Sequence, residues 1–228
     1  ARFVLCNASA QVLERLTGAS GDTQREVVEG AGFKINMLLE RLPKLRSPLC
    51  TASEAFAGTV HIDEGYEQML ASYQQSMAGE IPSTPPGEIY CHTLTDYSIL
   101  SNYLRHRGIQ TLTLFGLDMP YKLFEGDNER VRGEVLAKDL AWINRHLEEP
   151  LESCLAEDAN GELCIAAMSP VDLENAIHLP KWNFFHGDLT WPLSDGDDLA
   201  GTWGVETEHP RIYLCGTAAK RGGAVSGI

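Results

Sequence analysis

The clearest alternation of apolar and polar residues lies between residues 33 and 39. Its apolar positions are Phe33, Ile35, Met37 and Leu39, with Lys34 and Asn36 between them. In a β-strand, successive side chains point to opposite faces, so a pattern that repeats every two residues predicts a strand. One face of this strand is more polar than the other. We expect the strand to end before Pro43.

Three further segments predict strands. Residues 89–94 and 111–117 are rich in residues with high strand propensity, and a polar segment joins them. They therefore predict neighbouring strands of a mixed or antiparallel sheet. Residues 163–168 are another strand candidate.

Apolar residues at helical spacing predict two long helices. The first lies between Glu64 and Gly79, and Gly79 is well placed as its C-terminal cap. The second begins at Asn128, which we expect to cap it, and is interrupted by Pro150. The apolar face of this second helix comprises Val131, Val135, Leu140, Ile143 and Leu147. We expect this face to cover the sheet.

Both ends of the chain predict strands. Residues 2–7 form the first, and Ser9 can cap a short helix that Gly18 closes, which makes a β-α unit. Residues 212–215 form the last strand, which ends at Gly216 in a glycine-rich turn. We therefore expect the chain to be part of a larger protein, with both ends in one domain and a second domain between them.

Composition narrows the class of protein. The chain has 228 residues, of which 43% are hydrophobic and 22% charged, as is ordinary for a globular protein. Its net charge of -14 repels phosphate backbones, so nucleic acid is not an expected partner. No apolar run approaches the roughly 20 residues of a membrane helix, and no signal peptide opens the chain. We expect a cytoplasmic protein; peripheral membrane contact stays open.

The cysteines and histidines carry no recognisable catalytic or metal-binding pattern. The six cysteines contain no CxxC pair, and buried reduced thiols are their simplest interpretation. We therefore predict no metal site. His61, His92 and His178 show no pairing in the sequence, and neither a catalytic triad nor a phosphate-binding loop can be proposed from spacing.

Five segments, taken in order, resemble one family. They are residues 33–43, Thr95-Asp96, Met119-Pro120-Tyr121, residues 183–189 and the C-terminal strand with its glycines. Over nearly the whole chain they resemble the C-terminal half of phytoene-dehydrogenase-like flavoproteins. These are FAD-dependent oxidoreductases related to carotenoid desaturases, retinol saturases and, more distantly, amine oxidases.

The resemblance implies a domain organisation. In that family a substrate domain of sheet and helices interrupts a Rossmann-type FAD domain. Residues 1–20 and 205–228 would then belong to the FAD-binding domain, and residues 21–204 to the substrate-binding domain. The expected fold class is α/β (α+β): a mixed or antiparallel sheet covered by helices, flanked by remnants of the Rossmann-type domain.

The resemblance also implies where the cofactor binds. It places the terminal segment beside the isoalloxazine ring, with a helix N-terminus that stabilises the negative charge of reduced flavin. The cofactor-binding residues that it implies are Gly216, Thr217, Gly222, Gly223, Ala224 and Val225. Lys220-Arg221 depart from the family, which usually has proline or a similar small residue before the glycine pair.

The phosphate-binding fingerprint G-x-G-x-x-G is absent from the sequence. The single Gly-x-Gly, Gly30-Ala31-Gly32, precedes a predicted strand instead of following one. We therefore expect the chain by itself to bind FAD weakly or not at all, and to be inactive.

His186 is the weak catalytic candidate. With Gly187 and Asp188 it could form a polar trio at the substrate pocket that supplies a proton donor or an orienting group near the flavin. The alternative is a loop histidine whose hydrogen bonds are satisfied by the backbone or by Asp188. The sequence leaves both interpretations open.

The resemblance implies dehydrogenation, saturation or isomerisation of a small apolar or amphipathic substrate, by hydride-type transfer with the flavin. The alternative is a non-catalytic binding or interaction module that retains the substrate-domain fold. A strand followed by G-x-G-x-x-G upstream of residue 1 would favour the enzyme.

Overall fold

The computed structural model describes residues 1–18, 27–186 and 202–219. Contacts divide the chain into two compact units. The smaller unit contains Ala1–Gly30 and Val171–Ile228, and the larger contains Ala31–Pro170. This division does not decide which unit holds a cofactor or a substrate, so the domain roles predicted above stay a prediction. Gly222, Gly223, Ala224 and Val225 lie outside the described residues.

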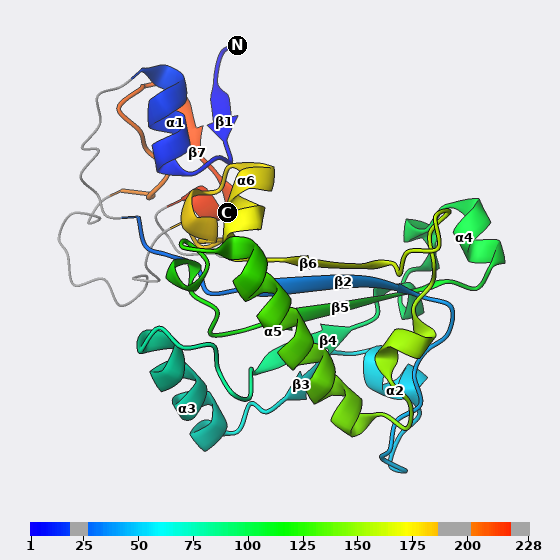
Figure 1. The fold of residues 1–228 in the computed structure, drawn as a ribbon. Coiled ribbons are helices and arrows are strands. Elements are labelled where there is room, and N and C mark those ends of the chain that lie inside the picture. The colour runs from blue at the N-terminus through cyan, green and yellow to red at the C-terminus, as the bar shows by residue number, and fades with distance from the viewer. Residues whose placement is uncertain (19–26, 187–201, 220–228) are drawn as a thin grey trace. The chain divides into compact units, whose positions relative to one another are not determined.

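The larger unit is built on a five-stranded sheet (Figure 1). Its strands are β2 (Phe33–Leu39), β3 (Val60–Ile62), β4 (Gly87–Tyr90), β5 (Gln110–Gly116) and β6 (Ile165–Met168). They lie in the order β3-β4-β5-β2-β6, and every neighbouring pair is antiparallel. The structure confirms the expected α+β class and a neighbouring pair of strands, β4 and β5. The strand predicted over residues 89–94 was wrong in its second half, because β4 ends at Tyr90 and residues 92–94 form a single helical turn.

Helices of the larger unit pack around this sheet. They are α2 (Ala52–Phe56), α3 (Tyr66–Met77), α4 (Asn102–His106) and α5 (Asn128–Ile143). The single turns are η1 (His92–Leu94), η2 (Tyr97–Ile99), η3 (Tyr121–Leu123), η4 (Asn144–His146) and η5 (Leu151–Cys154). The long helix α5 covers the sheet, as predicted (Figure 1).

The strand β2 forms the centre of the core. Phe33, Ile35, Met37 and Leu39 are all buried, as the alternation in the sequence predicts. The Phe33 ring stacks on Phe124 with 5.9 Å between ring centroids. Burial of each such side chain contributes about 1.5–3 kcal/mol, so the buried face of β2 stabilises this unit substantially.

Three predictions about α5 were wrong. The helix ends at Ile143, so Leu147 is not part of its apolar face. Asp127, not Asn128, caps the helix, and its side chain accepts a hydrogen bond from the Arg130 amide at 3.2 Å. Leu140 is only half-buried, whereas Asp139 is 2% exposed in the core. Apolar spacing alone could not predict that a carboxylate occupies a position on the buried face.

The helix α3 forms where the spacing predicts, but its apolar residues lie on the exposed side. Tyr66 is 81% exposed and Tyr73 53%, whereas Ser72 and Ser76 are buried. Small serine side chains allow the backbone of a helix to approach its neighbours closely. The periodicity therefore predicted the helix correctly but marks its outer face. Gly79 follows the helix with φ +82°, the conformation expected after a helix C-terminus.

The smaller unit contains a parallel strand pair. Its strands are β1 (Val4–Cys6) and β7 (Ile212–Leu214), and its helices are α1 (Ala10–Thr17) and the greater part of α6 (Pro170–Ile177). The described residues of this unit also form the turns η6 (Pro180–Trp182) and η8 (Gly216–Ala218). Ser9 caps α1 and Gly18 ends it with φ +67°, as predicted.

Candidate functional site

The ends of β1 and β7 form an edge in the smaller unit that can hold a ligand. Val4 pairs with Ile212 in parallel register, and the Cys215 amide donates to the Cys6 carbonyl at 2.9 Å. Because parallel strands end at the same edge of a sheet, the residues that follow both strands meet there. Ligands of open α/β sheets bind at this carboxyl edge.

Asn7 and Gly216 meet at this edge, which we call the strand-end edge. A Cβ built on Gly216 would lie 2.5 Å from Asn7 Oδ1. Gly216 also has φ +61°, a conformation that favours glycine. The backbone conformation therefore favours glycine here, and any other residue would also displace the Asn7 side chain. The sequence analysis named Gly216 but missed Asn7, whose signal was a polar side chain directly after the first strand.

The helix α1 begins next to the strand-end edge. Ser9 is buried, and its hydroxyl accepts a hydrogen bond from the Val12 amide at 3.3 Å. The short connection from Cys6 to Ala10 therefore turns the chain tightly from a strand into a helix. Such strand-turn-helix connections present backbone N–H groups that suit anionic or electron-rich ligands.

Gly216 and Thr217 lie in the turn η8, directly after β7. Both are half-buried. The structure thus brings these two predicted residues to the strand-end edge. No statement follows for the other four cofactor-binding candidates, which lie outside the described part of the chain.

His186 is half-buried and has φ +60°. Its backbone amide donates to the Asn183 carbonyl at 2.8 Å, but its Nδ1 is buried without a hydrogen-bond partner among the described residues. Burial lowers the pKa of the imidazole, which favours the neutral ring. Asp188 lies outside the described residues, so the two interpretations of His186 stay open.

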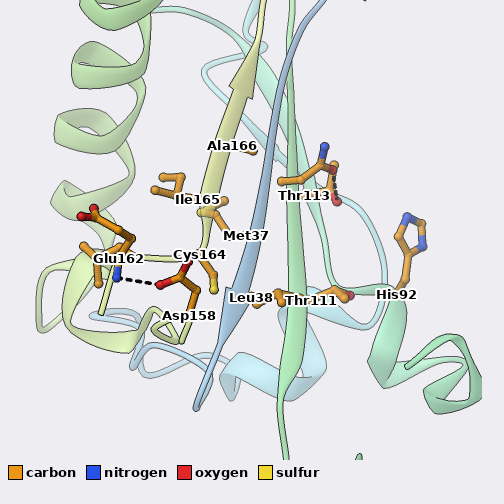
Figure 2. Close-up of a pocket in the computed structure, with 12 residues that line it drawn as sticks. Met37, Leu38, His92, Thr111, Thr113, Asp158, Glu162, Cys164, Ile165 and Ala166 are labelled. Carbon is orange, nitrogen blue, oxygen red and sulfur yellow. Dashed lines mark hydrogen bonds between the residues drawn. The ribbon is translucent and has the colours of Figure 1, made fainter. Parts of the chain in front are cut away.

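The larger unit has a separate pocket of about 550 Å³ along β2, β5 and β6 (Figure 2). Asn36 and Leu38 alternate with the buried residues of β2, so they face away from them. Thr113 Oγ1 donates to Asn36 Oδ1 at 3.2 Å, and the strand pairing places Ala166 next to Asn36. The sheet therefore presents a mixed apolar and polar floor.

His92 reaches the same pocket from the turn η1 (Figure 2). Thr93 and Thr111 each donate a backbone amide to the other's hydroxyl, at 3.3 and 3.0 Å, and this exchange fixes η1 on β5. The His92 ring lies 4.8 Å from that of Tyr90. His92 is consequently a polar group held at a defined place beside an apolar floor.

Asp158 also lines the pocket, but its carboxylate stabilises the local backbone through hydrogen bonds. Its carboxylate accepts hydrogen bonds from the amides of Glu162 and Asn160, at 3.0 and 2.8 Å. These bonds hold the pKa of Asp158 below its usual value. The pocket thus combines apolar walls with a few polar groups, among them the carboxylates of Asp158 and Glu162, a lining that suits an amphipathic small molecule.

One sequence expectation about histidines was wrong. His61 is paired, since its Nδ1 lies 2.7 Å from Glu64 Oε2.

None of the helices in the described ranges has the length and apolar character that crossing a bilayer requires.

The fold is a mixed α+β arrangement, and sequence comparisons relate the chain to known proteins. It is 45% identical, over 231 aligned residues and its whole length, to uncharacterized proteins of Mycobacterium tuberculosis and Mycobacterium bovis. The chain spans 42% of the length of these relatives. The sequence matches no established protein-family profile.

A more distant relative has an informative name. The mouse pyridine nucleotide-disulfide oxidoreductase domain-containing protein 2 is 26% identical over 219 residues. The match covers 90% of this chain and 34% of the mouse protein. The chain is therefore similar to a protein named for an oxidoreductase domain.

Proposed function

We propose that the protein is an FAD-dependent oxidoreductase that acts on a small apolar or amphipathic substrate. The observation that carries this proposal is the parallel pairing of β1 with β7, which brings Asn7 and Gly216 together at one strand-end edge. The similarity to the mouse protein supports it. The phytoene-dehydrogenase-like resemblance of the sequence supplies the finer assignment to FAD.

The strand-end edge fits the ring portion of such a cofactor. Gly216 has no side chain to obstruct a flat ring, and Asn7 offers both a donor and an acceptor. Thr217 would complete this part of the site, and Gly222, Gly223, Ala224 and Val225 would extend it as the sequence predicts. When bound, FAD would take up a hydride equivalent from a substrate C–H bond or return one.

Side chains of the larger unit would bind the substrate. Leu38, Ala166 and their neighbours in the pocket would bury an apolar part of the substrate and exclude water from it. His92 and Thr113 would orient a polar group. In the smaller unit, His186 would supply the polar group that the resemblance implies near the flavin.

The test is flavin content of the full-length protein. Purified protein should carry one flavin, seen as its yellow absorbance and released on denaturation. Gly216→Ala should lower the affinity for FAD at least tenfold, because the new Cβ displaces Asn7 and strains the turn.

Gly133→Ala is the matched control. Gly133 lies within α5 in open space, so the same change is harmless there and should leave the flavin bound. A folded full-length protein that binds no flavin would overturn the proposal and favour a non-catalytic binding module.

A further inference from the structure

We propose that His61, Glu64 and Glu88 form a binding site for a divalent transition-metal ion such as Zn²⁺. One imidazole nitrogen and one oxygen from each carboxylate all lie within 4.8 Å of one another. The three residues belong to the larger unit and share no residue or element with the strand-end edge.

Two of the ligands come from paired strands. His61 in β3 lies directly opposite Glu88 in β4 in antiparallel register. Side chains at directly opposite positions share one face of the sheet, with Cβ atoms about 4.5–5.5 Å apart. The sheet itself therefore holds these two side chains together, which a chance meeting of surface side chains would not achieve.

The third ligand comes from the turn that follows β3. Asp63 has φ +52°, and its carboxylate accepts a hydrogen bond from the indole N–H of buried Trp142 in α5. This bond anchors the turn to the long helix. The anchored turn places Glu64 Oε2 2.7 Å from His61 Nδ1.

One carboxylate oxygen of Glu64, Oε1, is buried without a hydrogen-bond partner among the described residues. A buried carboxylate oxygen normally has a donor or a cation beside it. A metal ion bound by Glu64 would provide that missing partner.

The charges of the group lack a balancing cation. Among the ion pairs of the described residues, neither Glu64 nor Glu88 is joined to lysine or arginine. A divalent cation would neutralise the two carboxylates.

The types of ligand atom in this group indicate which metal ions it would bind. One nitrogen with carboxylate oxygens suits Zn²⁺ and similar transition ions, whereas Ca²⁺ and Mg²⁺ prefer oxygen donors alone. Bonds of 2.0–2.2 Å in a tetrahedral site separate the ligand atoms by about 3.4 Å. Closing from 4.8 Å thus requires only modest side-chain rotation, and three protein ligands leave a fourth position for water.

Isothermal titration of the metal-stripped protein with ZnCl₂ tests this site. The Cys50→Ser background removes an exposed thiol that could bind zinc by itself. We expect one saturable site, and His61→Ala, Glu64→Gln and Glu88→Gln should each weaken it at least tenfold. The glutamine variants preserve shape, and circular dichroism confirms their fold.

Matched controls use residues outside the group. His106→Ala and Glu125→Gln remove an exposed imidazole and an exposed carboxylate, and both should leave the zinc affinity unchanged. The proposal is wrong if no saturable binding occurs, or if the three ligand variants bind zinc as the background does. A thiolate charge-transfer band with Co²⁺ would also overturn it, because the metal would then be bound by cysteine.

Discussion

Replacing Asp139 with asparagine tests the energetic effect of a buried carboxylate in α5. Asp139 is 2% exposed, and its Oδ2 has no hydrogen-bond partner among the described residues. Burial raises the pKa of this carboxyl from 3.8 to about 7, and the nearby charge of Lys138 opposes the rise only in part. The folded protein therefore binds this proton more tightly than the unfolded chain does.

The sign of the pH dependence follows from that difference. Between the unfolded pKa of 3.8 and the folded pKa of about 7, the folded state holds more protons. The free energy of unfolding should therefore fall as the pH rises through this window and level off above it. One pKa unit is worth 1.36 kcal/mol, so the whole shift in the pKa of Asp139 corresponds to about 4 kcal/mol of unfolding free energy.

Asparagine has nearly the same shape as aspartate but does not ionise. Asp139→Asn should therefore stabilise the protein more at pH 8 than at pH 5, by about 3 kcal/mol, since about two units of the shift lie in that interval. Urea unfolding at several pH values measures the difference. The control Glu125→Gln removes an exposed carboxylate and should show no comparable trend. Parallel pH profiles for wild type and Asp139→Asn would refute the reasoning.

Two further substitutions test local interactions. Thr51→Ala removes the capping box in which Thr51 and Glu54 exchange hydrogen bonds at the start of α2. The variant should lower the free energy of unfolding in urea by about 1 kcal/mol. An unchanged unfolding midpoint would show that the cap contributes nothing. Trp142→Phe leaves the Asp63 carboxylate without its indole donor, and should lower the free energy of unfolding by about 1.5–3 kcal/mol. If Asp63→Asn causes the same loss in the Trp142→Phe background as in wild type, the two side chains do not interact.

The sequence predicts the elements whose signal is local. The alternation around Phe33 is strong because β2 has neighbours on both sides and one fully buried face. Ser9 and Gly18 mark the ends of α1 through contacts with residues close in the chain. Helix caps of this kind depend on residues close in the chain, which explains why they are predicted correctly.

The remaining features depend on packing between distant segments. Nothing near Ser72 in the sequence shows that α3 turns its serines inward and its aromatic residues outward. The burial of Asp139 likewise follows from the way α5 packs. The short strand β3 has only three residues, too few for a periodic pattern.

In the candidate sites, too, some residues can be predicted from local sequence and others only from the pairing of distant segments. Gly216 could be named from the glycine-rich turn, but Asn7 is a site residue only because β1 and β7 pair in parallel. His61 pairs with Glu64, which is close in the sequence, but Glu88 lies opposite His61 only because β3 and β4 pair in this register. Residue type indicates chemistry in a sequence, whereas strand pairing decides which residues can act together.

The two proposed sites can be separated experimentally, which makes each a check on the other. They share no residue, and different strand pairs hold them, β1 with β7 and β3 with β4. Gly216→Ala should therefore lower the affinity for FAD at least tenfold without changing zinc affinity, and His61→Ala should weaken zinc binding at least tenfold with flavin retained. If either variant lost both ligands while remaining folded, the sites would be energetically coupled. General unfolding would instead remove both ligands together with the circular dichroism signal, so the three explanations give different results.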